Sequence, residues 1–283
     1  MKKIFLFAAL IALLVPTACN KNGGTTETKE TILPAPSMAA NAKKLIVTHP
    51  ELRWIELTEN SRYIVATAVS KAAEQLEYFR GTYSVSGTKY TLNGFGTLEI
   101  NGNSLTLSPT GGDPVTLDFK EASKLAENDF FVTVCRAWKV EKTDLSVTTG
   151  GSNVGIVKNG CDLHAIAKEL VEKGINVNPD RLSGYDVNEI NLTRSQTLEI
   201  AFKGQNSFVG TYSLSPSGSF SYNMEGQAGN DIFNASASGT VTNKDPYESD
   251  TTGKKIWMIL NAKLSSGSTT YNGRVIFTLS PAS

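Results

Sequence analysis

The feature that most constrains this chain is a period-two alternation of apolar and polar residues, repeated in short runs from Arg53 onward. Clusters of Gly, Ser, Asn and Pro separate the runs, and Asn101-Gly102 forms a strong hairpin turn between two of them. Alternation places one set of side chains on one face of a strand, and most connections are short enough for hairpins. The sequence therefore predicts a mainly β protein with antiparallel sheets that form a barrel or a sandwich.

The expected strands fall into two groups. The first group lies near 53–57, 63–68, 79–85, 89–92, 97–100, 104–107 and 115–119. The second lies near 139–147, 189–192, 197–202, 208–214, 219–223, 232–241, 255–264 and 270–279. We therefore expect an N-terminal β unit over 43–120 and a C-terminal barrel-like domain over 121–283.

One segment has a helical period instead. Asp162 suits an N-cap and Gly174 a residue just past the C-terminus, and five apolar residues between them share a face, namely Leu163, Ile166, Ala167, Leu170 and Val171. The pattern predicts a helix over 162–173 that closes one end or side of the β structure. His164 lies off the apolar face and is interpreted as a solvated residue. The segment 129–138 fits a helix or a strand, and a short helix is favoured.

The first nineteen residues have the pattern of an export signal. Lys2 and Lys3 precede an apolar run over 4–15, which is too short to span a bilayer, and Ala18 precedes Cys19. The end of this signal looks like a bacterial lipobox, although Pro16 stands where Leu is usual. The resemblance implies a signal peptide over 1–18 and lipid attachment at Cys19. An ordinary cleaved signal, with Cys19 lost or incidental, is the alternative.

The segment 19–42 is interpreted as a flexible tether between the lipid and the body. Residues 20–37 are polar, include a Gly pair and two prolines, and lack an apolar period, so they cannot bury enough surface to offset the entropy of ordering. No Asp follows Cys19, and by resemblance to lipoprotein sorting rules this favours the outer membrane. The expected partners are the membrane, through the lipid, and an unknown small molecule, glycan or envelope protein.

The composition excludes one class of partner. The chain has 27 Lys plus Arg and 27 Asp plus Glu, and removal of Lys2 and Lys3 leaves 25 basic residues against 27 acidic ones. This near-neutral, interspersed charge lacks the basic patch of a nucleic-acid-binding protein. Cys135 and Cys161 remain after Cys19; they form either a disulfide, which the exported compartment permits, or two buried thiols.

An internal repeat links the two halves. The block that begins Ile55-Glu-Leu57-Thr58 matches Ile190-Asn-Leu192-Thr193, and further on Phe79-Arg-Gly81-Thr-Tyr83-Ser matches Phe208-Val-Gly210-Thr-Tyr212-Ser. Two matched blocks in the same order indicate duplication of a β unit. Within the second block, the tyrosines either pack in a core beside a strand bend at the glycine or form a stacking platform for a ligand.

The lipobox with Cys19, the polar tether and the repeated units resemble the uncharacterised lipoproteins of Bacteroidetes, some of which have lipocalin-like β domains. The order of strand, helix and antiparallel strands in the second half is similar to a lipocalin-like barrel. Arg136-Ala137-Trp138 stands where lipocalins have Gly-x-Trp. The resemblance implies a β barrel without an established activity.

No combination of residues in the sequence specifies a catalytic, cofactor or metal site. His49 and His164 are the only histidines, and neither a nucleophile elbow nor a phosphate-binding glycine loop occurs. We therefore expect a non-enzymatic β module that needs no cofactor. In a barrel with a ligand cavity, Trp54, Tyr83, Tyr212 and Trp257 are the candidate ligand-facing aromatics. The alternative is a glycan-processing enzyme with a pair of carboxylates.

Overall fold

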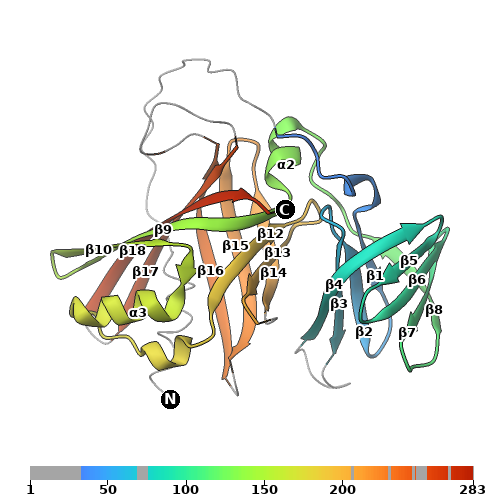
Figure 1. The fold of residues 1–283 in the computed structure, drawn as a ribbon, viewed down its shortest axis with the longest axis horizontal. Coiled ribbons are helices and arrows are strands. Elements are labelled where there is room, and N and C mark those ends of the chain that lie inside the picture. Colours follow the sequence, from blue (N-terminus) through green and yellow to red (C-terminus); the bar gives the residue numbers. More distant parts are fainter. Residues whose placement is uncertain are drawn as a thin grey trace. The chain divides into compact units, whose positions relative to one another are not determined.

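The computed structural model describes residues 33–68, 76–204, 207–228, 231–243, 246, 254–266 and 269–282. The chain divides into two compact units (Figure 1). One unit comprises Pro34–Glu127 with Thr193–Ser195, and the other comprises Asn128–Leu192 and the chain from Gln196 onward. Each contains a closed antiparallel barrel, which confirms the predicted fold class. The division falls after residue 127, whereas the sequence analysis placed it after residue 120.

The first barrel is a simple meander of eight strands, and it closes where β1 pairs with β8. Its elements are η1 (Ala39–Asn41), β1 (Lys43–Val47), β2 (Leu52–Leu57), β3 (Arg62–Ala68), β4 (Leu76–Ser86), β5 (Lys89–Leu92), β6 (Gly96–Asn101), β7 (Ser104–Pro109) and β8 (Val115–Glu121). Strand β1 has only two buried alternating positions, Leu45 and Val47, and it was not predicted.

A continuous apolar core occupies the first barrel. Its buried members are Leu45, Val47, Leu52, Ile55, Leu57, Tyr63, Val65, Tyr83, Tyr90, Leu92, Leu98, Leu105 and Leu107. Met38 packs against this core and Ala42 is buried, so the end of the predicted tether belongs to the folded body. The correction follows from chemistry that the tether prediction ignored, since burial of even two apolar side chains favours ordering of the short segment between them.

The second barrel consists of β9 and β12 to β18, and it closes where β9 pairs with β12. Its elements are α2 (Asp129–Val134), β9 (Ala137–Thr149), β10 (Ser152–Asn159), β11 (Cys161–Asp162), α3 (Leu163–Glu172), η2 (Pro179–Leu182), β12 (Asp186–Leu192), β13 (Thr197–Phe202), β14 (Ser207–Leu214), β15 (Ser219–Ala228), β16 (Asp231–Thr242), β17 (Ile256–Ser266) and β18 (Thr269–Pro281).

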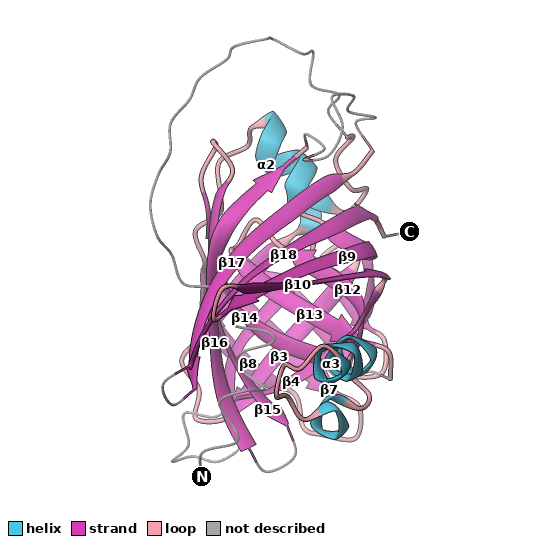
Figure 2. Ribbon diagram, turned by 90° about the vertical axis from the view of Figure 1, so that its left-hand side faces the viewer, coloured by secondary structure: helices cyan, strands magenta, loops and turns pink. Residues whose placement is uncertain are grey.

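The two helices lie at opposite ends of the second barrel (Figures 1 and 2). The Asn128 side chain accepts a hydrogen bond from the Phe131 N–H at 2.8 Å and so caps α2. At the other end, Asp162 Oδ1 accepts from the N–H groups of His164 and Ala165 at the start of α3. Both predicted helices are therefore present, and each begins at a side-chain cap that the sequence displays.

The repeated blocks occupy equivalent strands of the two barrels. Gly81 on β4 pairs with Tyr63 on β3, and Gly210 on β14 pairs with Leu198 on β13. A Cβ atom on Gly81 would lie 2.7 Å from the Asn93 carbonyl oxygen, and one on Gly210 would lie 2.3 Å from that of Asn223. Glycine recurs in both blocks because the neighbouring backbone comes too close for any side chain.

The turns before the paired strands are equivalent as well. Ser61 and Gln196 both have a positive φ, 60° and 64° respectively, although neither is glycine. The carbonyl of Ser61 accepts from the Tyr83 N–H at 2.8 Å, and that of Gln196 accepts from the Tyr212 N–H at 3.0 Å. The repeat inferred from the sequence thus corresponds to one hairpin geometry used twice, β2–β3–β4 in the first barrel and β12–β13–β14 in the second.

Candidate functional site

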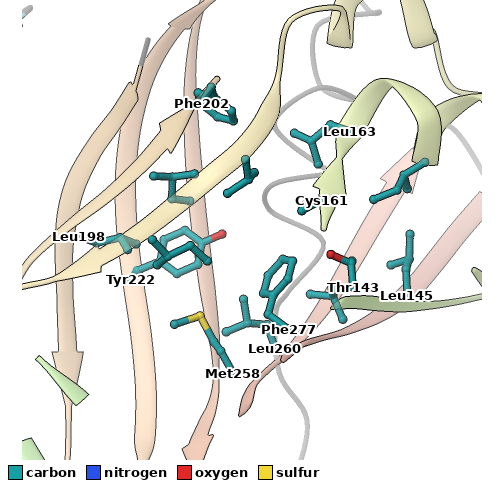
Figure 3. Close-up of a pocket in the computed structure, with 15 residues that line it drawn as sticks. Thr143, Leu145, Cys161, Leu163, Leu198, Phe202, Tyr222, Met258, Leu260 and Phe277 are labelled. Carbon is teal, nitrogen blue, oxygen red and sulfur yellow. The ribbon is translucent and has the colours of Figure 1, made fainter. Parts of the chain in front are cut away.

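An internal cavity of about 70 Å³ lies inside the second barrel (Figure 3). One water needs about 10–15 Å³ by a comparable measure, so the space holds more than a single water molecule. The residues that line it are Thr143, Leu145, Cys161, Leu163, Ile166, Val187, Ile190, Leu198, Ile200, Phe202, Tyr222, Met258, Leu260, Val275 and Phe277. Six barrel strands, β11 and α3 contribute, and nearly all of these side chains are apolar.

Strand alternation explains which side chains reach the cavity. Leu198, Ile200 and Phe202 are every second residue of β13, and Met258 and Leu260 follow the same rule on β17. The two ends of the cavity differ in what closes them. In Figure 3, Leu163 lies beside α3 and Phe202 lies across the upper part of the view from it, whereas Leu198, Tyr222 and Met258 lie lower.

Between Leu198 and α2, a plug of packed side chains, formed by Trp138, Tyr212 and Cys135, closes the barrel. Trp138 is fully buried and its Nε1 donates to the Val134 carbonyl at 2.8 Å, which ties β9 to α2. The Tyr212 hydroxyl and the Cys135 thiol lie 3.3 Å apart in a hydrogen bond. Arg136 donates hydrogen bonds to the carbonyl oxygens of Val132 and Thr133. These carbonyl groups belong to the last turn of α2, where they have no partner within the helix.

The α3 end is closed more loosely, by an insertion that has no counterpart in the first barrel. Strand β12 pairs with β9 only over Glu189–Asn191, and its first residues pair with β11 instead. Strand β10 takes the remaining length of β9. The barrel wall is therefore interrupted between β9 and β12, and Leu163 and Ile166 of α3 cover the interruption from outside the sheet.

The few polar groups of the lining are already engaged. The Thr143 hydroxyl donates to the Gly160 carbonyl at 2.7 Å. Burial raises the pKa of the Tyr222 phenol, and burial also raises the pKa of the Cys161 thiol to about 12 despite a hydrogen bond with Thr143. Among the residues that line the cavity, none is an aspartate, glutamate or histidine. The site is suited to apolar binding and offers no group for acid–base chemistry at neutral pH.

None of the four aromatic residues predicted to face a ligand lines this cavity. Tyr83 lies in the core of the first barrel, where its hydroxyl donates to the Thr58 carbonyl at 3.1 Å. Trp54 is half-buried, with Lys44 Nζ 4.0 Å from its ring centre. Tyr212 belongs to the plug at the α2 end, and Trp257 is buried on the face of β17 opposite to its cavity-lining neighbour Met258.

Sequence reasoning missed the cavity because it looked for aromatic residues. The signal that was available is the alternation of apolar residues, most of them aliphatic, along β13, β17 and β18. His164, interpreted as solvated, is instead partly buried, and its Nδ1 lies 2.8 Å from the Pro179 carbonyl, so it fixes α3 to η2.

Cys135 and Cys161 are buried thiols that form no disulfide, so the structure favours the second of the two alternatives drawn from the sequence. Both are about 1% exposed, and burial keeps Cys161 protonated. In a chain carrying Cys19→Ala, we expect neither thiol to react with a thiol-specific dye before unfolding and two thiols per chain to react in denaturant. A disulfide would leave no reactive thiol in denaturant without a reducing agent.

The remaining features to consider are the signal peptide, a metal site and a membrane-spanning helix. Cys19 and the signal peptide lie outside the described residues. Within the described ranges, no three His, Cys, Asp or Glu side chains are placed to hold a metal ion. No helix in the described part of the chain combines the length and the apolar composition needed to cross a membrane.

Comparison with known proteins gives little further information. No family model matches the sequence, and no curated protein matches it. Among solved structures, two mutants of the vaccine antigen transferrin binding protein B from Haemophilus parasuis are similar, with 10% and 9% identity and TM-scores of 0.26 and 0.24. Each alignment covers 79% of this chain and 52% of the other, so the chain spans about half the length of these structures. A likeness this weak carries no argument for function.

Proposed function

We propose that this protein is a lipid-anchored lipoprotein of the bacterial outer membrane whose second barrel binds a small apolar molecule. The observation that carries the binding proposal is the apolar cavity between the α2 plug and α3. The interior of the first barrel is a continuous buried core, and we propose that this barrel has a structural role. A largely apolar concave site enclosed by a rigid scaffold is the usual form of a small-molecule site.

The anchoring proposal rests on the sequence. Lys2, Lys3, the apolar run over 4–15 and Cys19 fit a lipoprotein signal, and the resemblance to Bacteroidetes lipoproteins supports the same location. Two or more acyl chains give stable attachment, whereas one chain is marginal. We expect Cys19→Ala to move the protein from the membrane fraction to the soluble fraction of lysed cells. Retention of the variant in membranes would refute the lipid anchor.

We propose a binding role in preference to catalysis. The alternative of a glycan-processing enzyme requires two carboxylates that flank an open cleft. The cavity lining supplies none. Glu59 in the first barrel has a pKa raised by burial to about 7, as a general acid would, but it is only 3% exposed and out of reach of a glycan.

A pair of matched substitutions tests the binding proposal. Val275→Phe adds a ring to the wall of the cavity, and Val157→Phe makes the same change at a residue of β10 that is 56% exposed. We expect short alkyl carboxylates or alkanols to raise the Tm of the wild-type chain and of the Val157 variant, because a ligand that binds only the folded state stabilises it. The Val275 variant should lose that rise.

The proposal would fail if apolar ligands of every shape left the Tm of the wild-type chain unchanged. It would also fail if the Val275→Phe variant responded as the wild-type chain does, since binding would then lie outside the cavity. Native mass spectrometry of protein purified without denaturation provides an independent reading, because a retained ligand adds a reproducible mass to the wild-type chain.

A further inference from the structure

We propose that the ligand is a single unbranched hydrocarbon chain, which enters the second barrel beneath α3 and leaves its polar head in water. This inference rests on the proposed function and names the class of ligand. Three properties of the cavity support it: its shape, the state of its polar groups and the position of its entrance. A comparison with the first barrel then identifies a residue that sets the depth.

The cavity extends along the strands of the barrel. Leu198 and Phe202 lie four residues apart on β13, which corresponds to about 13 Å at roughly 3.3 Å per residue. Strand pairing places Leu145, Val275 and Leu260 at one level of the barrel and Thr143, Phe277 and Met258 at the next level toward α2. A volume of about 70 Å³ drawn out over such a length has room for one extended chain but not for a fused ring system.

The wall of the cavity has few polar groups, and two of them, Thr143 and Cys161, are engaged within the protein. The hydroxyl of Thr143 donates to Gly160, and the thiol of Cys161 interacts with Thr143. Tyr222 also takes part in an interaction within the protein, and its ring packs against Phe220 at 6.2 Å between ring centres. A polar ligand group buried here would lose its bonds to water without replacement, which is unfavourable. The buried part of the ligand is therefore pure hydrocarbon, and any head group stays outside.

The entrance lies where the barrel wall is interrupted. The residues of β12 that precede Glu189 do not pair with β9. Leu163 and Ile166 of α3 line the cavity at this place. The start of α3 is joined to the chain around it by the backbone bond from the Leu163 N–H to the Tyr185 carbonyl and by the contact of His164 with Pro179. The opposite end is sealed by Trp138 and the plug around Tyr212. We infer that a chain enters from the α3 end, with its methyl end leading.

The first barrel shows what determines the depth. Tyr63 occupies the position equivalent to Leu198, since each pairs with the repeated glycine of the next strand. The Tyr63 ring fills the barrel at this level, and its hydroxyl donates to the Asn93 carbonyl at 2.9 Å. The Leu198 side chain is smaller than that of Tyr63 and does not fill the second barrel at this level. We infer that Leu198 is the residue that limits the length of chain the second barrel accepts.

A chain-length series tests this inference. The mature chain with Cys19→Ala, which carries no attached lipid, is titrated by calorimetry with hexanoate, octanoate, decanoate and dodecanoate, and with adamantane carboxylate as a compact ring system. We expect the affinity to rise by about fourfold for each added methylene until the channel is full and then to level off. Adamantane carboxylate should bind at least tenfold more weakly than decanoate.

Leu198 variants test the depth. Leu198→Phe should leave hexanoate affinity within about threefold of wild type and shift the plateau to shorter chains, whereas Leu198→Ala should shift it to longer ones. Opposite shifts cannot arise from a general loss of folding. If the ring compound bound as tightly as decanoate, or if both variants weakened every ligand equally, the unbranched-chain inference would be overturned while the proposed function stood. If neither shape bound, both would fall.

The chain could come from a free fatty acid or from a membrane lipid, and a second arm separates these sources. The same protein is incubated with phosphatidylethanolamine vesicles that contain dodecanoate, recovered, and examined by native mass spectrometry. A retained phospholipid mass identifies a lipid taken from the bilayer, and a retained dodecanoate mass identifies free acid. Retention of neither, by a protein that also failed to bind free acids in the titration, would refute a hydrocarbon ligand.

Discussion

Replacing Trp138 by alanine is expected to destabilise the second barrel by about 3–5 kcal/mol, the usual cost of removing a large buried aromatic side chain. Trp138 has no exposed surface and is among the largest fully buried side chains of the protein. The substitution also removes the hydrogen bond from Nε1 to the Val134 carbonyl. Because Trp138 is part of the plug and that bond joins β9 to α2, the substitution leaves a cavity inside the plug and removes a link between the two elements.

Two further variants separate packing from the hydrogen bond. Trp138→Phe keeps most of the buried area and is expected to cost less than the alanine variant, with about 1 kcal/mol of the loss due to the missing bond. Trp54→Ala, at a half-buried tryptophan of the first barrel, should leave the unfolding transition of the second barrel unchanged. Urea unfolding followed by circular dichroism measures all three. A loss below about 1 kcal/mol for Trp138→Ala would contradict the structural role given to the plug.

The β architecture was predictable because it depends on local patterns. Alternation, the Asn101-Gly102 turn and the cap at Asp162 each act over a few residues, and the structure has the corresponding strands, hairpin and helix. Strands β1 and β10 were missed because their apolar residues are too few to show a period. Strand β1 pairs with β8 where the first barrel closes, and β10 pairs with β9 outside the closed second barrel, so both are specified by their partner strands and not by their own sequence.

The site was not predictable by the same means. Alternation says that Tyr212 and Tyr222 share a face, but not that one joins a plug while the other lines a cavity. That difference depends on the level at which α2 enters the barrel and on the interruption between β9 and β12. The repeat did carry a usable signal, because aligned positions differ: the first barrel has Tyr63 where the second has Leu198.

The repeat also explains how one fold accommodates two interiors. The two hairpins are equivalent: each has the repeated glycine and, at the same place in the turn, a residue other than glycine with a positive φ. These features fix the backbone of both barrels. Side chains inside the barrel can then change without a change of topology, since cores tolerate substitution when volume and patterning are kept. The second barrel departs from this by an insertion, β10 to η2, which replaces part of the wall with α3.

The stability of the first barrel should depend on pH through Glu59. Its side chain is 3% exposed, and Oε1 accepts from the Arg194 N–H at 3.0 Å. Within the described structure, Oε2 has no hydrogen-bond partner. Burial therefore favours the protonated form and raises the pKa of Glu59 from 4.5 to about 7. Protonation lowers the free-energy cost of burying Glu59, because a neutral carboxyl group costs less to bury than a carboxylate.

The sign of the effect follows from proton linkage. Between pH 4.5 and about 7 the folded state holds the Glu59 proton while the unfolded state releases it, so stability falls as pH rises and is level again above pH 7. The difference amounts to about 3 kcal/mol, at about 1.4 kcal/mol per pKa unit. Glu59→Gln resembles the protonated form and retains an oxygen for the Arg194 N–H, so its stability should lack this dependence.

The measurement is the unfolding free energy of wild type and Glu59→Gln at pH 4.5, 6 and 8. Relative to wild type, the glutamine variant should gain about 3 kcal/mol between pH 4.5 and pH 8, whatever constant penalty its amide adds. Glu77→Gln, at an exposed position of β4, should show no such gain. An equal difference at all three pH values would mean that Glu59 ionises normally in the folded protein. The burial that holds the β2–β3 turn against Arg194 would then be too loose to exclude water.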